Sequence, residues 1–289
     1  MKIDFMGIGT PRAGTTWIFH CLKTHPQICM SLVKETYFFH EFLKVQSRHK
    51  GLEFYRRYFR HCTPDKVIGE FTPHYLTDPD APRLIKDFFP DIKLIVSLRN
   101  PVERLYSLFN FWNVRGKHDI ATFEEFIDRE KKDAVCTNYY HKYLANYLEL
   151  FPEENILILI YEDIARDPQA FIKTVYRFLG VEQDFVPNQL HKAINVGKDH
   201  RGWILSRGAY RVIRTIEGCP WGRKTIDRLM TSRVRALYDA VMDRSSSGTQ
   251  QKPSRPLIKD ETRRELLKLY EEDILKLERL LGRSLDFWR

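Results

Sequence analysis

The chain has 289 residues, of which 43% are hydrophobic and 29% are charged. This composition is typical of a soluble globular protein and excludes a disordered chain. No apolar run reaches the roughly 18–20 residues that a membrane-spanning helix needs. Lys and Arg number 47 against 38 Asp and Glu, which gives a net charge of +9. This charge favours an anionic partner without indicating which kind.

The cysteines and the N-terminus point to a compartment. The five cysteines are odd in number, are scattered and contain no Cys-x-x-Cys pair: Cys21, Cys29, Cys62, Cys136 and Cys219. This pattern argues against a disulfide framework or a zinc site and favours a reducing compartment. The N-terminus carries Asp4 almost at once and lacks the long apolar stretch of a signal peptide. We therefore expect a cytoplasmic protein.

Short apolar runs alternate with helical patterns in the first 180 residues. Strands that alternate with helices form a parallel sheet that is covered by helices on both faces. The sequence therefore predicts an α/β fold of three layers with about five parallel strands. The strands are predicted at 3–8, 27–32, 67–71, 92–98 and 156–161, and the helices at 15–22, 80–89, 102–115, 122–132, 139–150 and 167–179.

The last third of the chain is predicted to be helical. Helical stretches are expected at about 207–216 and 221–243, and a small polar segment at 245–256 is expected to be a mobile loop. Residues 260–281 form an amphipathic pattern with one apolar stripe, which predicts a helix packed on the rest of the protein. We expect a single domain over residues 1–289 with a helical C-terminal part.

The first turn of the chain has features of a phosphate site. Residues 9–16 read GTPRAGTT between a predicted strand and helix, where backbone N–H groups and the helix N-terminus attract anions. A nucleoside-triphosphate P-loop would have a Lys where this chain has Thr15, and here the cation lies inside the loop at Arg12. The spacing alone also suits an ordinary strand–helix turn, but its place between strand and helix favours phosphate binding.

A second candidate anion site follows the strand at 92–98. Arg99 ends that strand, at the sheet edge where open α/β folds bind ligands. Ser107 lies about two helical turns beyond Pro101 and can face back towards Arg99. An Arg–hydroxyl pair suits a terminal phosphate, although each residue alone would also suit a surface loop and a helix. Residues 97–99 offer no carboxylate for magnesium, which counts against a kinase.

The segment Lys34-Glu35 is the candidate source of a general base. The apolar residues at 37–39 are expected to raise the pKa of the Glu35 carboxyl, and such a carboxylate can deprotonate an acceptor hydroxyl. The alternative is a solvated Lys–Glu ion pair without a catalytic role. Rival bases are three histidines of the first half of the chain: His20, His40 and His74.

These strings together resemble one enzyme family. PRAGTTW at 11–17 is similar to the 5′-phosphosulfate loop of sulfotransferases that use 3′-phosphoadenosine 5′-phosphosulfate (PAPS), and RNP-x5-S at 99–107 resembles their 3′-phosphate motif. KETYFF at 34–39 resembles the base segment of the heparan-sulfate-modifying and related bacterial branch. GEFTPHY at 69–75 resembles the strand end beside the acceptor. The resemblance implies a P-loop-like three-layer fold.

The resemblance also assigns roles. It gives Glu35 the role of general base and Lys34 that of a helper near the leaving group or the acceptor, and it lets Arg12 neutralise the bridging oxygen as the sulfuryl group leaves. The nucleotide's 5′ end would be held by Arg12, Ala13, Gly14, Thr15, Thr16 and Trp17, and its 3′ phosphate by Arg99, Ser107, Lys198 and Arg201. The acceptor site would be lined by Thr72, His74 and Tyr75.

The resemblance therefore implies a sulfotransferase that moves the sulfuryl group of PAPS to a hydroxyl or amine, without a metal, and releases the desulfated nucleotide PAP. The expected acceptor is a carbohydrate or a related metabolite, and no nucleic acid or membrane partner is expected. The alternatives are a magnesium-dependent P-loop kinase and a non-enzymatic binder of anionic polymers. The polymer binder would use residues 198–235, where ten Lys or Arg face three acids. This basic stretch also suits an anionic acceptor or a solvated helical face.

Overall fold

The computed structural model describes residues 2–40, 51–114, 120–191 and 258–289. The chain divides into two compact units, one of residues 1–105, 130–192 and 259–289 and one of residues 106–129 and 193–258. We describe each unit by itself. Several predictions fall outside the described residues, namely the helices at 207–216 and 221–243, the loop at 245–256, the basic stretch, Lys198 and Arg201.

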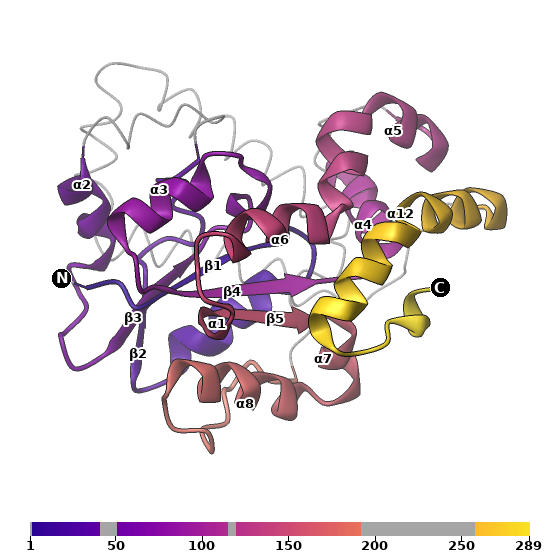
Figure 1. Ribbon diagram of the computed structural model, residues 1–289. Helices are drawn as coiled ribbons and strands as arrows, with labels where there is room; N and C mark the ends of the chain where they lie inside the picture. Colours follow the sequence, from indigo (N-terminus) through magenta and orange to yellow (C-terminus); the bar gives the residue numbers. More distant parts are fainter. Residues whose placement is uncertain (1, 41–50, 115–119, 192–257) are drawn as a thin grey trace. The chain divides into compact units, whose positions relative to one another are not determined.

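A sheet of five parallel strands forms the centre of the first unit, in the order β2-β3-β1-β4-β5 (Figure 1). The predicted α/β fold and its parallel sheet are confirmed. Strand β2 is shorter than predicted, because the N–H of Leu32 bonds to the carbonyl of Tyr58 (2.8 Å) outside the sheet. The strands are β1 (Phe5–Gly9), β2 (Ile28–Met30), β3 (Val67–Phe71), β4 (Lys93–Leu98) and β5 (Ile156–Ile160).

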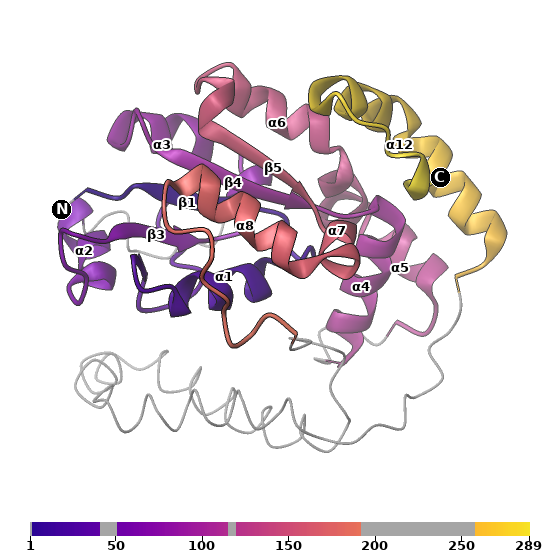
Figure 2. The same ribbon diagram turned by 90° about the horizontal axis from the view of Figure 1, so that it is seen from below.

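Helices cover both faces of this sheet. Helices α1 (Thr15–Thr24) and α8 (Pro168–Leu179) lie on one face, and α3 (Ala81–Phe88) and α6 (Tyr140–Leu148) lie on the other (Figures 1 and 2). Trp17 of α1 packs edge-on against Phe171 of α8, with ring centroids 5.9 Å apart. The other elements of this unit are α2 (Leu52–Arg56), α7 (Glu162–Arg166), α12 (Asp260–Leu281) and the short turns η2 (Arg57–Phe59), η3 (Tyr75–Thr77), η4 (Lys131–Val135), η5 (Cys136–Asn138), η6 (Glu153–Asn155) and η7 (Asp286–Trp288).

Hydrogen bonds from the C-terminal segment hold the start of α6 and the loop after β4. A carboxylate of α12, that of Asp273, accepts the N–H groups of His141 (3.0 Å) and Lys142 (3.1 Å) and so caps the first turn of α6. Trp288 is buried, and its carbonyl accepts a hydrogen bond of 2.7 Å from the Asn100 side chain. The end of the chain is thereby fastened to the loop that follows β4.

The second unit is described over two short stretches. Helix α4 (Pro101–Val114) begins in the first unit, and its residues from 106 onward belong to the second together with α5 (Phe123–Arg129). Aromatic rings hold these stretches together, since Phe109 lies 5.6 Å from Phe126 and Tyr106 lies 5.6 Å from Phe123, centroid to centroid. No helix in the described parts of either unit is long and apolar enough to cross a bilayer.

The prediction that the cysteines form no disulfide is wrong. Cys29 of β2 is bonded to Cys62, which follows η2, with their Cα atoms 5.7 Å apart. The bond forms because the α2–η2 segment folds back beside β2, and the carbonyl of Tyr58 in η2 accepts the N–H of Leu32, two residues after β2. A spacing of 33 residues gives no sign of this contact. The cysteine-based argument for a reducing compartment therefore loses its basis.

Candidate active site

The carboxyl ends of the parallel strands meet at one edge of the sheet. Strand order changes direction there, because β3 and β2 lie on one side of β1 while β4 and β5 lie on the other. Ligands of open α/β sheets bind at such a switch point. The segments that leave β1, β2, β3 and β4 at this edge carry Arg12, Glu35, His74 and Arg99, respectively. The topology thus collects the main predicted site segments at one edge.

The loop after β1 is fixed through its carbonyl groups. Three successive carbonyls accept side-chain hydrogen bonds: Pro11 from Arg104 Nε (2.9 Å), Arg12 from Arg99 Nη1 (3.3 Å) and Ala13 from Ser97 Oγ (2.7 Å). The C=O and N–H of a trans peptide point in opposite directions, so the N–H groups of Arg12 and Gly14 point away from these donors. Outward-held carbonyls and inward amides are the arrangement of an anion-binding loop.

Gly14 connects this loop to α1 at a place where only glycine fits. Its φ of 77° is left-handed, and a Cβ there would lie 2.9 Å from side-chain atoms of Tyr161 and Ile164. Helix α1 begins directly afterwards at Thr15 and has no acidic residue in its first turn. The helix N-terminus therefore keeps its partial positive charge beside the loop. Trp17, in contrast, is buried in the packing against α8.

Two arginines donate hydrogen bonds to the loop after β1, namely Arg99 and Arg104. The RNP-x5-S motif predicted a role only for Arg99. Arg99 is half-buried, with its guanidinium carbon 4.7 Å from the ring centroid of Tyr161. Arg104 is 2% exposed and also donates to the side chain of Asn138 (2.6 Å) and to Thr137. Burial lowers the pKa of Arg104. The missed signal was a second arginine, Arg104, five positions after Arg99 in the first turn of α4.

The candidate base Glu35 is paired on both oxygens. Its Oε1 lies 2.6 Å from Lys34 Nζ, and its Oε2 accepts the hydroxyl of Tyr37. Burial raises the pKa of the Glu35 carboxyl, but the charge and hydrogen bond of Lys34 and the hydroxyl of Tyr37 outweigh burial, so the pKa lies below its usual value. The expected rise in the Glu35 pKa is therefore wrong, and the carboxylate is ionised at neutral pH. Its side chain is 30% exposed.

Backbone strain coincides with the two predicted segments. In the part of the chain that the structure describes, the non-glycine residues with positive φ are Arg12 (72°), Glu35 (69°) and Tyr37 (53°). A non-glycine residue in the left-handed region costs roughly 1–2 kcal/mol. Such strained residues concentrate at functional sites, where the surrounding structure holds them. All three lie in the phosphate-like loop or the base segment.

A buried carboxylate, Glu70 at the end of β3, joins the base segment to the sheet. Four hydroxyls surround it: Thr36 Oγ1 (2.7 Å), Thr72 Oγ1 (2.7 Å), Tyr55 OH (2.7 Å) and Tyr75 OH (3.2 Å). The N–H groups of Glu35 and Thr36 bond to the Phe71 carbonyl (3.0 Å) and to Thr72 Oγ1 (3.0 Å). Glu70 is thus a positioning residue that the sequence prediction missed, although it lies inside the GEFTPHY string.

The predicted acceptor-lining residues divide into two kinds. Thr72 and Tyr75 are fully buried, and their hydroxyls are used by the Glu70 network. The GEFTPHY motif had suggested that these two side chains line the acceptor site, whereas the structure places them in the interior. His74 is half-buried, with its ring centroid 5.4 Å from that of Tyr37. Burial lowers the pKa of His74 to about 4, so the imidazole is neutral at pH 7.

Replacing Glu70 with alanine is expected to lower the free energy of unfolding by on the order of 3 kcal/mol, because buried hydroxyls lose their acceptor. Urea unfolding of the variant and the wild type measures this difference. The matched control is Glu53→Ala, since the Glu53 side chain is 81% exposed, and this control should change stability little. Equal stabilities of Glu70→Ala and Glu53→Ala would contradict the role of Glu70.

Glu70 should also make the free energy of unfolding depend on pH. Burial raises the pKa of Glu70 above its usual value of 4.5, so the folded protein holds this proton more tightly than the unfolded chain. Stability from this group is therefore greatest at acid pH and declines as the pH rises through the folded pKa. Glu70→Gln should remove this decline, and Glu53→Gln should keep it.

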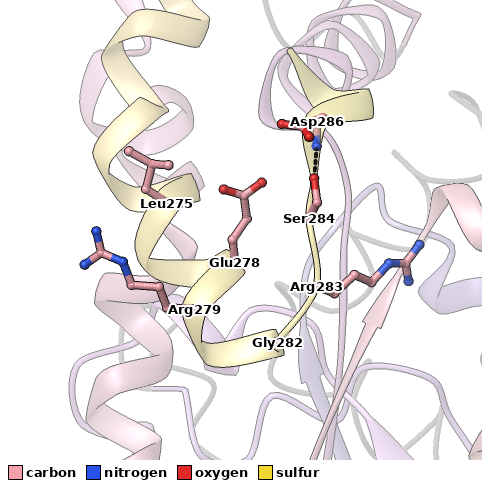
Figure 3. Close-up of a pocket in the computed structure, with 7 residues that line it drawn as sticks. All are labelled: Leu275, Glu278, Arg279, Gly282, Arg283, Ser284 and Asp286. Atoms are coloured by element: carbon pink, nitrogen blue, oxygen red, sulfur yellow. Dashed lines mark hydrogen bonds between the residues drawn. The ribbon is translucent and has the colours of Figure 1, made fainter.

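An open pocket of about 420 Å³ lies elsewhere, at the end of α12 (Figure 3). Most of its charged side chains form ion pairs. Arg283 binds both oxygens of Asp163 (2.5 and 2.7 Å), and Glu278 pairs with Arg289 (2.7 Å). None of the predicted site residues lines this pocket, and its contacts fasten the C-terminal segment.

Two of the predicted nucleotide residues lie in different units. The structure places Ser107 on α4 within the second unit, while Arg99 belongs to the first. The pairing of Ser107 with Arg99 therefore stays a prediction. The structure does bring Arg99 to the loop of Arg12, and Glu35 to the segment of His74 through the Glu70 network.

Comparison with known proteins identifies the family and the fold. The profile of the sulfotransferase domain family matches residues 2–246. Among solved structures, a sulfotransferase from Alicyclobacillus acidocaldarius is similar with a TM-score of 0.67 and 21% identity, over 100% of this chain and 99% of that chain. This structural likeness supports the fold.

Curated relatives carry related names. Mouse heparan sulfate glucosamine 3-O-sulfotransferase 3B1 is 30% identical over 212 residues, which are 67% of this chain and 53% of the relative. Membrane-associated sulfotransferase kil1 of Dictyostelium discoideum is 35% identical over 46% of this chain and 29% of that protein. The chain thus spans about half the length of the mouse relative and less of the other. Because the family profile covers most of its length, this chain belongs to the sulfotransferase family.

Proposed function

We propose that the protein transfers the sulfuryl group of PAPS to a hydroxyl or amine of a carbohydrate-type acceptor, with Glu35 as the general base. One observation carries this proposal. A phosphate-like loop without the P-loop lysine and a carboxylate paired with a lysine leave the same edge of the sheet, from strands β1 and β2 on either side of β3. The loop suits an anionic donor, and the carboxylate suits removal of an acceptor proton.

The 5′ phosphosulfate is proposed to lie on the loop of residues 10–14. The amides of Arg12 and Gly14 and the N-terminus of α1 supply hydrogen bonds and partial positive charge. The guanidinium of Arg12 adds a full charge for the bridging oxygen. Because Ser97, Arg99 and Arg104 hold the loop carbonyls, the amides are oriented before the nucleotide binds, which lowers the cost of binding.

The 3′ phosphate is proposed to bind Arg99, together with Ser107, Lys198 and Arg201 from the parts of the chain beyond the first unit's described residues. Arg99 follows β4 directly, and its guanidinium lies on the ring of Tyr161, which restricts its orientation. A guanidinium held in one plane can bind two phosphate oxygens at once.

The transfer step follows from these groups. The acceptor oxygen or nitrogen attacks the sulfur in line while its proton passes to Glu35. The bond between sulfur and the bridging phosphate oxygen breaks, and PAP leaves with the electron pair, stabilised by Arg12 and the loop amides. Lys34 keeps Glu35 ionised before the reaction. The neutral imidazole of His74 is proposed to hydrogen-bond the acceptor beside this carboxylate.

The acceptor class rests on the KETYFF segment and on the relatives. Those relatives are named for heparan sulfate glucosamine, a carbohydrate. The basic stretch at 198–235 is proposed to face an anionic acceptor. Residues 97–99, at the end of β4, contain no carboxylate to hold the magnesium of a nucleoside triphosphate, which disfavours the kinase alternative.

Calorimetric titration with PAP tests the nucleotide part of this proposal. We expect saturable one-to-one binding of PAP in the presence of EDTA, because side chains and amides neutralise the phosphates without a metal. ATP should bind more weakly, since its triphosphate does not match two phosphate sites at separate ends. Binding of magnesium–ATP without any binding of PAP would contradict the proposal and favour a kinase.

A further inference from the structure

A second cluster of reactive side chains lies between the edge strand β2, which carries Cys29, and the segment after η2, which carries His61 and Cys62. His61 precedes Cys62 in the chain, and its Nε2 lies 3.4 Å from Cys29 Sγ and 3.8 Å from Cys62 Sγ. Cys29 is half-buried and His61 is exposed. The proposed transfer reaction uses none of these three residues. Two sulfurs and one imidazole nitrogen within 4.8 Å of one another are a set of metal-ligand donors.

We propose that the reduced protein binds a thiophilic divalent cation, with Zn²⁺ as the natural candidate, through Cys29, Cys62 and His61. In the oxidised protein the two cysteines form the disulfide and the site is closed. A dithiol reductant supplies two electrons and two protons, which break the S–S bond and give two thiols. Binding of Zn²⁺ then releases the two thiol protons. The disulfide and the metal therefore exclude one another.

The geometry supports a three-ligand zinc site. Zn–S bonds of about 2.3 Å and a Zn–N bond of about 2.0 Å at tetrahedral angles place the nitrogen about 3.6 Å from each sulfur. The observed distances of 3.4 and 3.8 Å bracket this value. The imidazole thus already lies where a ligand is needed. Only the two sulfurs must move apart, which rotation of their side chains provides.

The ligand types set the class of cation and the coordination. Thiolate and imidazole favour zinc or copper over magnesium or calcium, which prefer oxygen ligands. Because the His61 side chain is exposed, the fourth position is open to water. In the part of the chain that the structure describes, burial raises the pKa of one free thiol, that of Cys21, to about 12, so this cysteine is a poor competitor for the metal.

The site would preserve a link that the disulfide makes in the oxidised protein. The covalent bond fastens Cys62 to β2, and just after β2 the N–H of Leu32 also bonds to the carbonyl of Tyr58 (2.8 Å). A metal held by Cys29 and Cys62 joins the same two segments. The segment that leads from β2 to the candidate base would therefore remain anchored in both redox states.

Titration of the full-length, untagged protein with Co²⁺ tests the proposal. The protein is reduced with a phosphine, freed of reductant and kept anaerobic, and thiolate-to-cobalt charge-transfer absorbance is recorded. We expect one equivalent of Co²⁺ to bind, Zn²⁺ to displace it, and the oxidised protein to give no such absorbance. His61→Ala and Cys62→Ser should each weaken binding at least tenfold. The control Cys136→Ser should bind as the wild type does.

His61→Ala keeps both cysteines and changes an exposed side chain. It therefore tests the three-ligand site even if Cys62→Ser does not fold. Equal Co²⁺ affinity of His61→Ala and the wild type would overturn the three-ligand site. Absence of charge-transfer absorbance in the reduced wild type would overturn the metal site altogether. Because PAP binding involves none of these residues, a calorimetric titration of the same samples with PAP separates this outcome from a failure of the proposed function.

Discussion

Replacing Glu35 with alanine is expected to lower turnover by about 10²–10⁴-fold, the range that a general base contributes. The affinity for PAP should remain nearly unchanged, because no nucleotide role falls on this carboxylate. Glu35→Gln should lose similar activity, since the amide keeps the shape but cannot accept the proton. Initial rates with saturating PAPS, and calorimetry with PAP, measure the two effects separately.

The pH dependence of the same reaction distinguishes Glu35 from a histidine base. The ion pair with Lys34 outweighs burial and keeps the pKa of Glu35 below 4.5. The base is therefore already ionised at neutral pH, and kcat/KM should stay level as the pH falls from 7 to about 5. A loss of rate centred near pH 6.5 would instead indicate a base with the ordinary pKa of a histidine.

Glu53→Ala provides the matched control for Glu35→Ala, because it removes an exposed carboxylate from α2. It should leave both turnover and PAP affinity unaltered. If Glu35→Ala weakened PAP binding as strongly as the loss of a nucleotide-binding arginine does, Glu35 would be a structural residue and its assignment as base would fail.

Replacing Arg99 with alanine is expected to weaken PAP binding by about 10–100-fold, because charge-assisted hydrogen bonds to the 3′ phosphate contribute roughly 1.5–3 kcal/mol. Arg99→Lys should recover only part of this loss, since an ammonium group cannot bind two phosphate oxygens in one plane. Turnover at saturating PAPS should fall much less than affinity does. Calorimetry and steady-state kinetics give the two values.

Arg166→Ala is the control for Arg99→Ala. Arg166 lies on α7, its side chain is 71% exposed, and it pairs with Asp163 at 3.5 Å. PAP affinity should be the same in this variant as in the wild type. An unchanged PAP affinity in Arg99→Ala would remove this arginine from the nucleotide site and leave its bond to the Arg12 carbonyl as its role.

The sequence predicts the sheet and the loop at its edge for a simple physical reason. Strands such as β4 and β5 are buried on both faces, so they are continuous apolar runs that are visible without tertiary information. The loop before α1 is visible because glycine is required at a left-handed position such as Gly14. Local requirements of this kind leave a local sequence signal.

Features that depend on distant contacts leave no such signal. The direction of the Glu35 pKa depends on whether the side chain of Lys34 reaches the carboxylate, and the apolar neighbours alone suggested the opposite shift. Arg104 holds the first loop across 93 residues of sequence. The Cys29–Cys62 bond likewise depends on how α2 and η2 return to β2. Sequence spacing cannot predict which of these groups meet.

The most direct test of the central claim is transfer of labelled sulfate from PAPS to a set of carbohydrate acceptors, measured with and without EDTA. We expect label to appear in at least one hydroxyl- or amine-bearing saccharide, at a rate that EDTA does not change and that Glu35→Ala abolishes. Absence of transfer to every acceptor, together with magnesium-dependent phosphoryl transfer from ATP to the same saccharides, would contradict the account.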